Sequence, residues 1–328
     1  MLLDRSSTIP ALIVTLCVFA SLIACGGNPS PPSSANTPAT SPATGAAAPA
    51  APPQSATTQA NVVMVVEENH SYEQVIGNTN MPYLNGLAQQ GALAQQYYAS
   101  AHPSIPNYFD LTTGATQTLD NNWPGPLAAD NLARELNVAG KPWKVYAEDL
   151  PSQGYLGTSM GNYIKHHNPF AYFTDVVNDP NQAANIVPFS QFANDLNAGR
   201  LPAFSFVIPN LPDDAHSCAT GVTCDDNSML AYADQWLKNN IAPLLTSPQF
   251  QRSGLLLITF DESNLADLRN GGGRVPLIAA GPKAKPGAQS STLYRHENTL
   301  KTVCAVLGIA NCPGGAANAA AEDDLLQH

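Results

Sequence analysis

Five apolar runs, each ending abruptly in polar residues, are the feature of this chain that most limits its possible folds. Each run has four to six apolar residues, and they lie within NVVMVVEEN, KPWKVYAEDL, AFSFVIPNL, GLLLITFDES and VPLIAAGP. Continuous runs of this length suit strands buried on both faces, as in a parallel sheet. Helical patterns alternate with them at residues 81–94, 128–139, 189–198, 227–245 and 296–308. The alternation predicts a single α/β domain whose mostly parallel central sheet is sandwiched by helices.

The N-terminal region does not follow this alternation. Arg5 precedes IPALIVTLCVFASLIAC, which is short for a membrane span and resembles the hydrophobic region of a secretory signal. It ends in Leu-Ile-Ala-Cys, which resembles a bacterial lipobox, so we expect a signal peptide over residues 1–24 and a lipid on Cys25. The protein would then be exported and held at a membrane of the bacterial cell envelope. An ordinary signal peptide with an incidental cysteine, which would give a secreted protein, is the alternative.

Composition divides the rest of the chain. Residues 25–60 are rich in Pro, Ala, Ser and Thr and carry no charge, so we expect a disordered linker. The folded domain would span residues 61–315, and residues 316–328 would form a flexible tail. The net charge of −11 argues against nucleic acid as a partner, because phosphate backbones attract basic surfaces.

Four cysteines fall within the expected domain as two close pairs. In an exported chain the local disulfides Cys218–Cys224 and Cys304–Cys312 are the favoured interpretation. A four-cysteine zinc site is the alternative, but the C-x-x-C spacing typical of such sites is absent from the sequence.

Chemically reactive residues follow the ends of the expected strands, where ligands bind in open α/β sheets. The polar segments are Glu67–His70 after the first run, His102–Asn107 at a helix start, Lys165–Phe170 in a loop, Asp213–His216 after AFSFVIPNL, Asp261–Glu262 after GLLLITF, and His296 at the start of the last helix. Each has an ordinary explanation by itself, such as a solvated loop acid or, for Ser104, a helix cap. Their convergence at one edge of one sheet predicts a site.

Several carboxylates at one edge would repel one another unless a cation neutralised them. Oxygen ligands combined with imidazoles suit a divalent metal, without choosing among metals. A serine beside such a metal becomes a nucleophile, because coordination lowers the pKa of its hydroxyl. The helix that starts at Ile105 would direct its free N–H groups at the same point, and the Asn107 amide would donate to another oxygen, which together suit a phosphate group.

Six segments in order resemble the bacterial phosphoesterase family over about residues 61–311. They are EENHSYEQVIG, HPSIPNYFDLTTG, KHHNPFAYF, PNLPDDAH, ITFDES and YRHENTLKTVCAVLG. That family includes secreted acid phosphatases and phosphatidylinositol-phosphate phosphatases, with non-haemolytic phospholipases C as more distant relatives. The resemblance implies a fold like that of alkaline phosphatase.

The resemblance also implies roles for individual residues. Ser104 would be the nucleophile and a metal ligand, and Asn107 would bind phosphate. The other ligands of the metal that holds Ser104 would be Glu68, Asn69, Asp261 and Glu262. The opposite side would be lined by His167, Asp214, His216 and His296. Asp214 and His216 would bind a second metal there, or the histidines would act on the phosphate and the leaving group.

Some points stay open at this stage. His166 duplicates the imidazole of His167, so either can enter the site. Ser263 and Ser217 stand where the family commonly has glycine and an acid, respectively. Residues 264–274, NLADLRNGGGR, suggest a short flexible loop near the site. The metals number one or two, and zinc, manganese, magnesium and calcium are not distinguished.

The function that follows is metal-dependent hydrolysis of phosphomonoesters, of the acid phosphatase type, through a phosphoserine intermediate on Ser104. The substrate would be a phosphorylated small molecule or a phosphoinositide or other phospholipid. A phosphodiesterase of the phospholipase C type is the first alternative. A lipoprotein that binds a phosphorylated ligand without cleaving it is the second.

Overall fold

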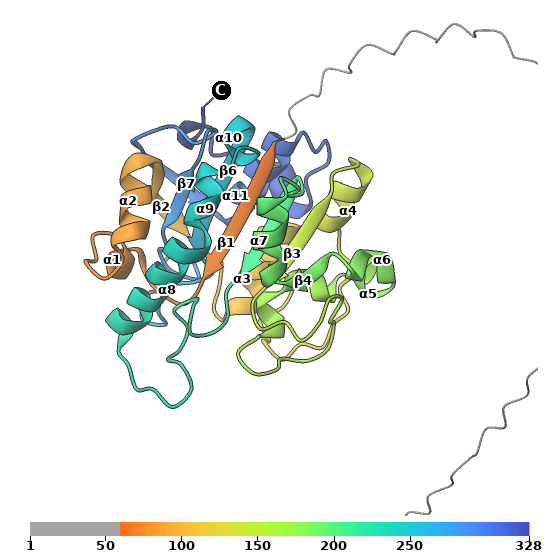
Figure 1. The fold of residues 1–328 in the computed structure, drawn as a ribbon, viewed down its shortest axis with the longest axis horizontal. Coiled ribbons are helices and arrows are strands. Elements are labelled where there is room, and N and C mark those ends of the chain that lie inside the picture. Colours follow the sequence, from red (N-terminus) through yellow and green to blue (C-terminus); the bar gives the residue numbers. More distant parts are fainter. Residues whose placement is uncertain (1–59, 328) are drawn as a thin grey trace, which may run out of the picture. The chain divides into compact units, whose positions relative to one another are not determined.

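One eight-stranded sheet forms the centre of the molecule (Figure 1). The computed structural model describes residues 60–327, and the strand order is β4-β3-β5-β1-β6-β7-β2-β8. β7 runs antiparallel to β6 and β2, and the other neighbouring pairs are parallel. The strands are β1 (Asn61–Glu67), β2 (Ala92–Tyr98), β3 (Trp143–Ala147), β4 (Ile186–Pro188), β5 (Phe204–Ile208), β6 (Gly254–Phe260), β7 (Leu277–Ala280) and β8 (Ala288–Arg295).

Helices cover both faces of the sheet. In Figure 1, α8 and α9 lie in front of the sheet and α11 lies behind it. α2 packs against α8 and β7, whereas α3 packs against α11. The helices are α1 (Tyr72–Val75), α2 (Pro82–Gln90), α3 (Ser104–Thr113), α4 (Leu132–Val138), α5 (Thr174–Val177), α6 (Pro180–Ala183), α7 (Ser190–Asn197), α8 (Asp226–Asn240), α9 (Ala242–Thr246), α10 (Phe250–Ser253) and α11 (His296–Leu307). Short 3₁₀ turns are η1 (Lys165–His167), η2 (Pro169–Tyr172), η3 (Gly314–Ala317) and η4 (Asp323–Leu325).

The five predicted strands correspond to β1, β3, β5, β6 and β7, and the predicted α/β sandwich is confirmed. The helix predicted over residues 81–94 is wrong at its end, because α2 stops at Gln90 and β2 begins at Ala92. Gly91 lies between α2 and β2, where the backbone passes close to β7. A Cβ atom at Gly91 would lie 2.2 Å from the carbonyl oxygen of Ala279, so no larger residue fits there.

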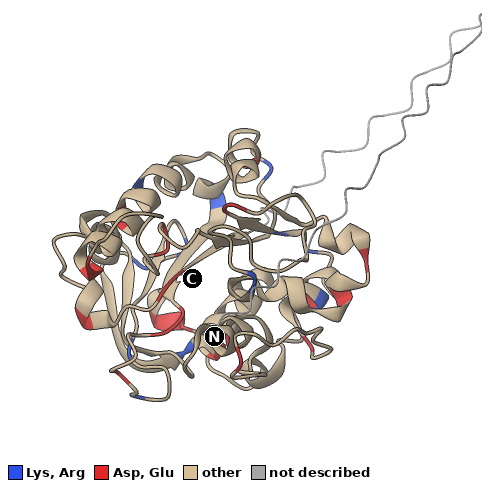
Figure 2. Cartoon of the chain, turned by 90° about the horizontal axis from the view of Figure 1, so that it is seen from below, with Lys and Arg blue, Asp and Glu red and all other residues tan. Residues whose placement is uncertain are grey.

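The register between β1 and β6 brings two acidic segments together. All seven residues of β1 are buried, and Glu67 lies opposite Phe260 at the carboxyl end of β6. The residues that directly follow the two strands are therefore Glu68 and Asp261. The Asp261 N–H donates a hydrogen bond of 2.9 Å to the Glu67 carbonyl. This edge of the sheet lies at the bottom of Figure 1 and faces the viewer in Figure 2.

α3 starts at the same edge and is buried along its whole length. Ser104 is its first residue, and Gly114 ends it in a left-handed conformation with φ 65°. The N–H of Ile105 donates to Asn121 Oδ1 over 3.0 Å, and Pro106 has no N–H. The prediction that the first N–H groups of this helix are free for a phosphate is therefore wrong for these two residues.

The C-terminal segment is not the flexible tail that its Ala, Gly and Asn content suggested. Leu325 and Leu326 are buried, and Leu326 forms a β-bridge with Ala284. Asp324 accepts hydrogen bonds from three side chains of β8, those of Ser290, Thr292 and Tyr294. The packed domain therefore continues to residue 327, because two leucines and one acid fix a segment of otherwise weak composition.

Both predicted disulfides, Cys218–Cys224 and Cys304–Cys312, are present in the structure. Among the described residues no helix combines the length and apolar character needed to cross a bilayer. The predicted signal peptide, the Cys25 lipid site and the linker up to residue 59 lie outside the described residues, as does His328.

Asp110 makes the stability of the domain depend on pH. It is buried in α3, its Oδ2 accepts a hydrogen bond from Ser100 Oγ, and burial raises the pKa of its carboxyl from 3.8 to about 7. A raised pKa means that the protonated acid stabilises the folded state fully below the ordinary pKa of 3.8, and that this stabilisation is lost as the pH rises through about 7.

We therefore expect the free energy of unfolding to fall between about pH 5 and pH 8 by on the order of 2 kcal/mol through this group alone. Urea unfolding of the wild type and of Asp110→Asn at both pH values measures the effect. The asparagine cannot titrate, so the variant should lose less stability by about that amount. Equal losses in the two proteins would contradict the assignment.

Candidate active site

The Ser104 hydroxyl lies between two carboxylates at the carboxyl edge of the sheet. Ser104 Oγ donates to Glu68 Oε2 over 3.2 Å and lies 3.5 Å from Glu262 Oε1. Ser104 is the first residue of α3, Glu68 directly follows β1, and Glu262 is the second residue after β6. All three are buried. The structure thus brings together the predicted nucleophile and two of its predicted companions.

Glu68 is the centre of the site. Its Oε1 accepts a hydrogen bond of 2.6 Å from Tyr108 Oη and lies 3.2 Å from His167 Nε2. Its Oε2 accepts a hydrogen bond of 2.9 Å from Asn69 Nδ2 and lies 3.1 Å from His216 Nδ1. Burial alone would raise the pKa of Glu68, but the charge of His167 and the contacts of His216 and Tyr108 lower it to about 2. These contacts favour the ionised form of the Glu68 carboxyl.

The Asp261–Glu262 pair completes the same side. Asp261 Oδ1 accepts hydrogen bonds from the N–H groups of Asn69 at 3.2 Å and Glu262 at 2.6 Å. Burial, followed by the negative charge of Glu68, raises the pKa of Asp261 well above its usual range and that of Glu262 to about 8. Two further carboxylates cannot easily ionise next to Glu68 without a compensating positive charge.

Asp214 approaches from the other side of Glu68. Its Oδ1 accepts a hydrogen bond of 2.8 Å from the N–H of His216, and its Oδ2 lies 3.4 Å from His167 Nδ1. Burial and then the charge of Glu68 raise the pKa of Asp214 well above its usual range. The predicted residues Asp214, His167 and His216 therefore do gather beside Glu68.

The buried carboxylate oxygens of these residues fit a metal ion. Oδ2 of Asp261 is buried and has no hydrogen-bond partner within the described part of the chain. Oδ2 of Asp214 lies 3.4 Å from Nδ1 of His167, and Oε2 of Glu262 lies 2.6 Å from Nδ1 of His102. Glu68, His167 and His216 also offer ligand atoms that all lie within 4.8 Å of one another. Carboxylate oxygens with imidazole nitrogens form a donor set for a divalent cation. The predicted metal site is thus supported by the donors, and the identity of the metal is not fixed by them.

The structure decides between the two neighbouring histidines. His167 is buried, contacts Glu68, and stacks on Tyr108 with the ring centroids 5.1 Å apart. His166 packs edge-on against His167 from outside, with centroids 4.8 Å apart. Of the two rings, His167 contacts the acids of the site.

Asn107 does not face a phosphate position. Its Nδ2 donates to the carbonyl oxygens of Ala101 at 2.8 Å and Pro103 at 3.2 Å, and its Oδ1 accepts from the N–H groups of Ser100 and Ala101. The predicted role of its amide in binding phosphate is not supported by this arrangement, because both ends of the amide are bonded to backbone groups. Asn107 instead fixes the turn that leads to Ser104.

His296 also differs from its prediction. It is buried, its Nδ1 lies 2.9 Å from Tyr97 Oη, and its Nε2 lies 2.6 Å from the backbone oxygen of Asp261. Both ring nitrogens are engaged, so His296 neither binds a metal nor faces the substrate in this arrangement. It lies behind the acid pair and supports it.

Two site residues were missed by the sequence reasoning. Tyr108 donates to Glu68, and His102 Nδ1 lies 2.6 Å from Glu262 Oε2. The signal for Tyr108 was its position four residues after Ser104 on one helix, which places both on the same helical face. His102 lies two residues before Ser104 in a turn, where spacing alone predicts no direction for the side chain.

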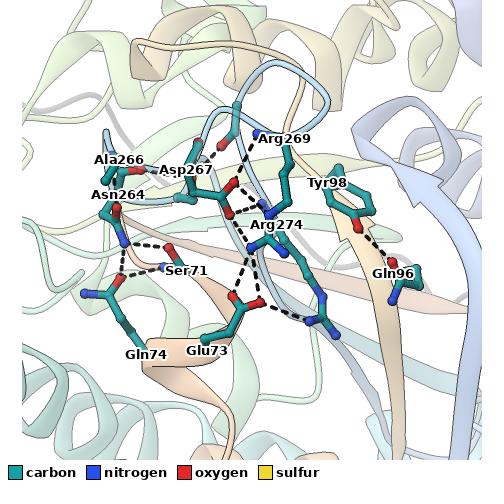
Figure 3. A network of polar contacts seen from close by, with 12 residues as sticks. Ser71, Glu73, Gln74, Gln96, Tyr98, Asn264, Ala266, Asp267, Arg269 and Arg274 are labelled. Carbon is teal, nitrogen blue, oxygen red and sulfur yellow. Dashed lines mark hydrogen bonds and ion pairs between the residues drawn. The ribbon is translucent and has the colours of Figure 1, made fainter.

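Hydrogen bonds and ion pairs connect the loop of residues 264–274, for which the sequence predicts flexibility, to the α1 region (Figure 3). Asp267 accepts a hydrogen bond of 2.8 Å from Arg269 Nε and one of 3.0 Å from the N–H of Arg274. Glu73 of α1 pairs with both arginines at 3.1 Å. Asn264 donates to Ser71 and Gln74 at the base of the loop, as Figure 3 also shows.

This loop forms one wall of the site. The carbonyl oxygen of Asp267 lies 3.1 Å from Nε2 of His102, the residue that also contacts Glu262. Gly271 has φ 108°, and a Cβ atom there would lie 2.2 Å from the Ser100 carbonyl oxygen. Only glycine allows the loop to approach the Ser104 turn this closely.

With the geometry established, comparison with known proteins identifies the family. Residues 78–310 match the model of the Phosphoesterase family. The chain belongs to this family. The predicted family is thereby confirmed, and the motifs that suggested it are those that converge on Ser104 and Glu68.

Several phosphatases are similar to this chain. A phosphatidylinositol-3-phosphatase of Mycobacterium tuberculosis is 37% identical over 273 residues, which cover 82% of this chain and 83% of that protein. A probable acid phosphatase of Kluyveromyces lactis is 31% identical, over 76% of this chain and 61% of the other. An acid phosphatase of Aspergillus fumigatus is 32% identical, over 74% and 53%. The chain thus spans just over half the length of these two fungal proteins.

Solved structures confirm the predicted fold. A protein of the alkaline phosphatase superfamily from Vibrio parahaemolyticus superposes with a TM-score of 0.58 at 14% identity, over 82% of this chain and 72% of the other. The lipoteichoic acid synthase LtaP from Listeria monocytogenes gives a TM-score of 0.55 at 13% identity, over 79% and 75%. The family member described here therefore has the alkaline phosphatase fold.

The buried carboxylates that gather beside Glu68 predict that a divalent metal stabilises the folded domain. After chelation, adding Zn²⁺, Mn²⁺, Mg²⁺ or Ca²⁺ singly should raise the Tm by roughly 5–10 °C for the metal that binds, at a concentration about 100 times its Kd. Glu262→Gln should reduce the shift, whereas Asp130→Asn, which changes an exposed acid paired with Arg134, should not. No shift with any of the four metals would contradict the metal site.

Proposed function

We propose that this member of the Phosphoesterase family hydrolyses phosphomonoesters as an acid phosphatase does, with Ser104 as the nucleophile. The observation that carries the proposal is the position of the Ser104 hydroxyl, within 3.5 Å of both Glu68 and Glu262 at the first residue of α3. The relatives named acid phosphatase and phosphatidylinositol-3-phosphatase support the same class of reaction.

The residues that would hold a metal follow from the donors described above. Glu68, Asn69, Asp261 and Glu262 surround Ser104 on one side, and Glu68 shares its other side with His167, Asp214 and His216. A bound divalent cation would supply a Lewis acid that lowers the pKa of a hydroxyl and neutralises phosphate charge. Tyr108 and the backbone N–H groups of Asn69 and Glu262 orient the carboxylates through their hydrogen bonds.

The proposed reaction has two steps. Ser104 Oγ attacks phosphorus as its proton passes toward Glu68, to which the hydroxyl donates. The bond to the leaving oxygen breaks, and a phosphoseryl enzyme forms. His216, whose side chain is 36% exposed, would protonate the leaving oxygen if it does not itself bind a metal. Water then hydrolyses the phosphoserine, which releases phosphate and restores the Ser104 hydroxyl.

Ser104→Ala should therefore lower kcat for p-nitrophenyl phosphate by at least about a hundredfold, because no other hydroxyl replaces the nucleophile. Steady-state kinetics with the stripped and metal-restored protein measure this. Ser190→Ala, at the exposed first residue of α7, is the matched control and should keep full activity. Retention of more than roughly a tenth of wild-type activity in Ser104→Ala would contradict the assignment.

Assays of the wild type with other substrates separate the alternative functions. Faster cleavage of bis-p-nitrophenyl phosphate than of the monoester would favour a phosphodiesterase of the phospholipase C type. Tight phosphate binding without turnover under any metal would favour a binding lipoprotein. Export and a lipid on Cys25 belong to the same proposal, and mass spectrometry of the N-terminal peptide from a membrane fraction tests them.

A lipid substrate is favoured by one surface feature. Leu265 and Leu268 are 75% and 67% exposed at the rim of the site, on the loop that Figure 3 shows to be braced. The acids Glu73 and Asp267 pair there with Arg269 and Arg274, so the loop presents apolar side chains without net charge. A rigid apolar tip beside a phosphate site suits a phosphoinositide in a bilayer, in line with the named substrate of the mycobacterial relative.

The double variant Leu265→Ser/Leu268→Ser should lower the rate on phosphatidylinositol 3-phosphate in phosphatidylcholine vesicles by about tenfold or more, because each buried leucine contributes roughly 1.5–3 kcal/mol. Its rate on soluble p-nitrophenyl phosphate should not change. Val138→Ser is the matched control, because Val138 is 73% exposed in the last turn of α4. Equal losses on both substrates, or no loss on vesicles, would contradict the lipid-facing role.

A further inference from the structure

A buried chain of hydrogen bonds joins the C-terminal segment to the acid pair of the site. Glu322 Oε1 lies 2.7 Å from Thr299 Oγ1, which lies 2.6 Å from Tyr97 Oη. Tyr97 Oη lies 2.9 Å from His296 Nδ1, and His296 Nε2 lies 2.6 Å from the backbone oxygen of Asp261. All five residues are buried. The chain starts on the segment after α11 and ends at the residue that precedes Glu262.

If every group in this chain of hydrogen bonds is neutral, the hydrogen bonds can point in only one direction along it. A carbonyl oxygen only accepts, so His296 Nε2 carries a hydrogen and Nδ1 of the neutral ring accepts one from Tyr97. The Tyr97 oxygen then accepts from Thr299, because its single hydrogen is already used. The Thr299 oxygen accepts from Glu322 for the same reason. Glu322 must therefore be a carboxylic acid that donates at the far end of the chain.

The opposite order needs two buried charges. If Glu322 were ionised, Thr299 and Tyr97 would both donate toward it, and His296 would have to donate from both ring nitrogens as an imidazolium. The total charge is the same, but the two opposite charges would be separated by two hydroxyl groups in a buried region, at a high desolvation cost. Glu322 Oε2 has no partner in the described residues that would stabilise an anion. Burial raises the pKa of Glu322 to about 8, which agrees with a protonated acid at this position.

We propose that Glu322 is a positioning residue of the active site, and that as a buried carboxylic acid it orders the Thr299, Tyr97 and His296 chain so that His296 donates to the Asp261 carbonyl. Through this bond it holds the backbone of the Asp261–Glu262 pair beside Ser104. Its effect on turnover rests on the function proposed above, whereas the order of the hydrogens does not.

The C-terminal segment carries Glu322 to this position by two separate attachments. The Glu322 N–H donates 2.8 Å to Thr302 Oγ1 of α11. Two residues later, Asp324 accepts hydrogen bonds from β8, including 2.7 Å from Tyr294 Oη. Asp324 therefore fastens the same segment without belonging to the chain that reaches His296. Substitutions of Asp324 therefore test how the segment is anchored, whereas substitutions of Glu322 test how the site is positioned.

The kinetic test compares a conservative and a disruptive variant. Glu322→Gln keeps an N–H donor toward Thr299, so kcat for p-nitrophenyl phosphate should stay within about twofold of wild type. Glu322→Leu and Tyr97→Phe each break the chain, and kcat should fall about 10- to 100-fold, as is typical when residues that support ligands are removed, with KM changed little. Asp324→Asn should lower the Tm but leave kcat unchanged at a temperature where it is folded.

Loss of activity in Glu322→Gln equal to that in Glu322→Leu would overturn the proposal, as would full kcat in Tyr97→Phe. Tyr97→Phe decides the matter if Glu322→Leu does not fold. ¹⁵N NMR of the His296 ring in the wild type, with His296→Asn for assignment, gives a readout that needs no turnover. One protonated ring nitrogen, Nε2, is expected. Two protonated nitrogens would show the ionised order and would overturn the proposal even in a protein without phosphatase activity.

Discussion

The parallel pairing of β1 with β6 is the constraint on which the rest of the site depends. It sets Glu67 opposite Phe260, so that Glu68 and Asp261 leave the sheet as neighbours. Side chains alternate between the faces of a strand, and a slip of one residue would send the two acids to opposite sides. The buried apolar residues of both strands make such a slip costly. Core packing thereby fixes the distance between carboxylates that chemistry requires.

Electrostatics explain why this arrangement calls for a ligand. Contacts with His167, His216 and Tyr108 favour the ionised form of Glu68. Burial first, and then the charge of Glu68, raises the pKa values of its acidic neighbours Asp214 and Asp261. Buried carboxylates without donors destabilise a fold unless a cation or a proton neutralises them. The same feature that costs stability without a cation therefore favours the binding of a divalent metal.

The sequence predicted the centre of the molecule better than its margins. The strands with continuous apolar runs and the acids that follow them were found, because burial on both faces leaves a strong pattern. β2, β4 and β8 were missed, because ALAQQYY and AQSSTLYR mix polar and apolar residues without such a run, and β4 has only three residues. The packing of the C-terminal segment depends on contacts such as Asp324 with Ser290, which no local pattern encodes.

Asn107 and His296 show why the roles of motif residues are harder to predict than their presence near a site. A side chain can act on a substrate only if its donors and acceptors are not already used, and the partners of both residues are set by tertiary structure. The Asn107 amide holds the turn before Ser104, and the His296 ring holds the backbone of Asp261. Both therefore fix the parts of the backbone that carry the reacting groups. A motif in this fold accordingly contains two kinds of residue, those that face the substrate and those that keep the first kind in place, and only the three-dimensional hydrogen-bond pattern separates them.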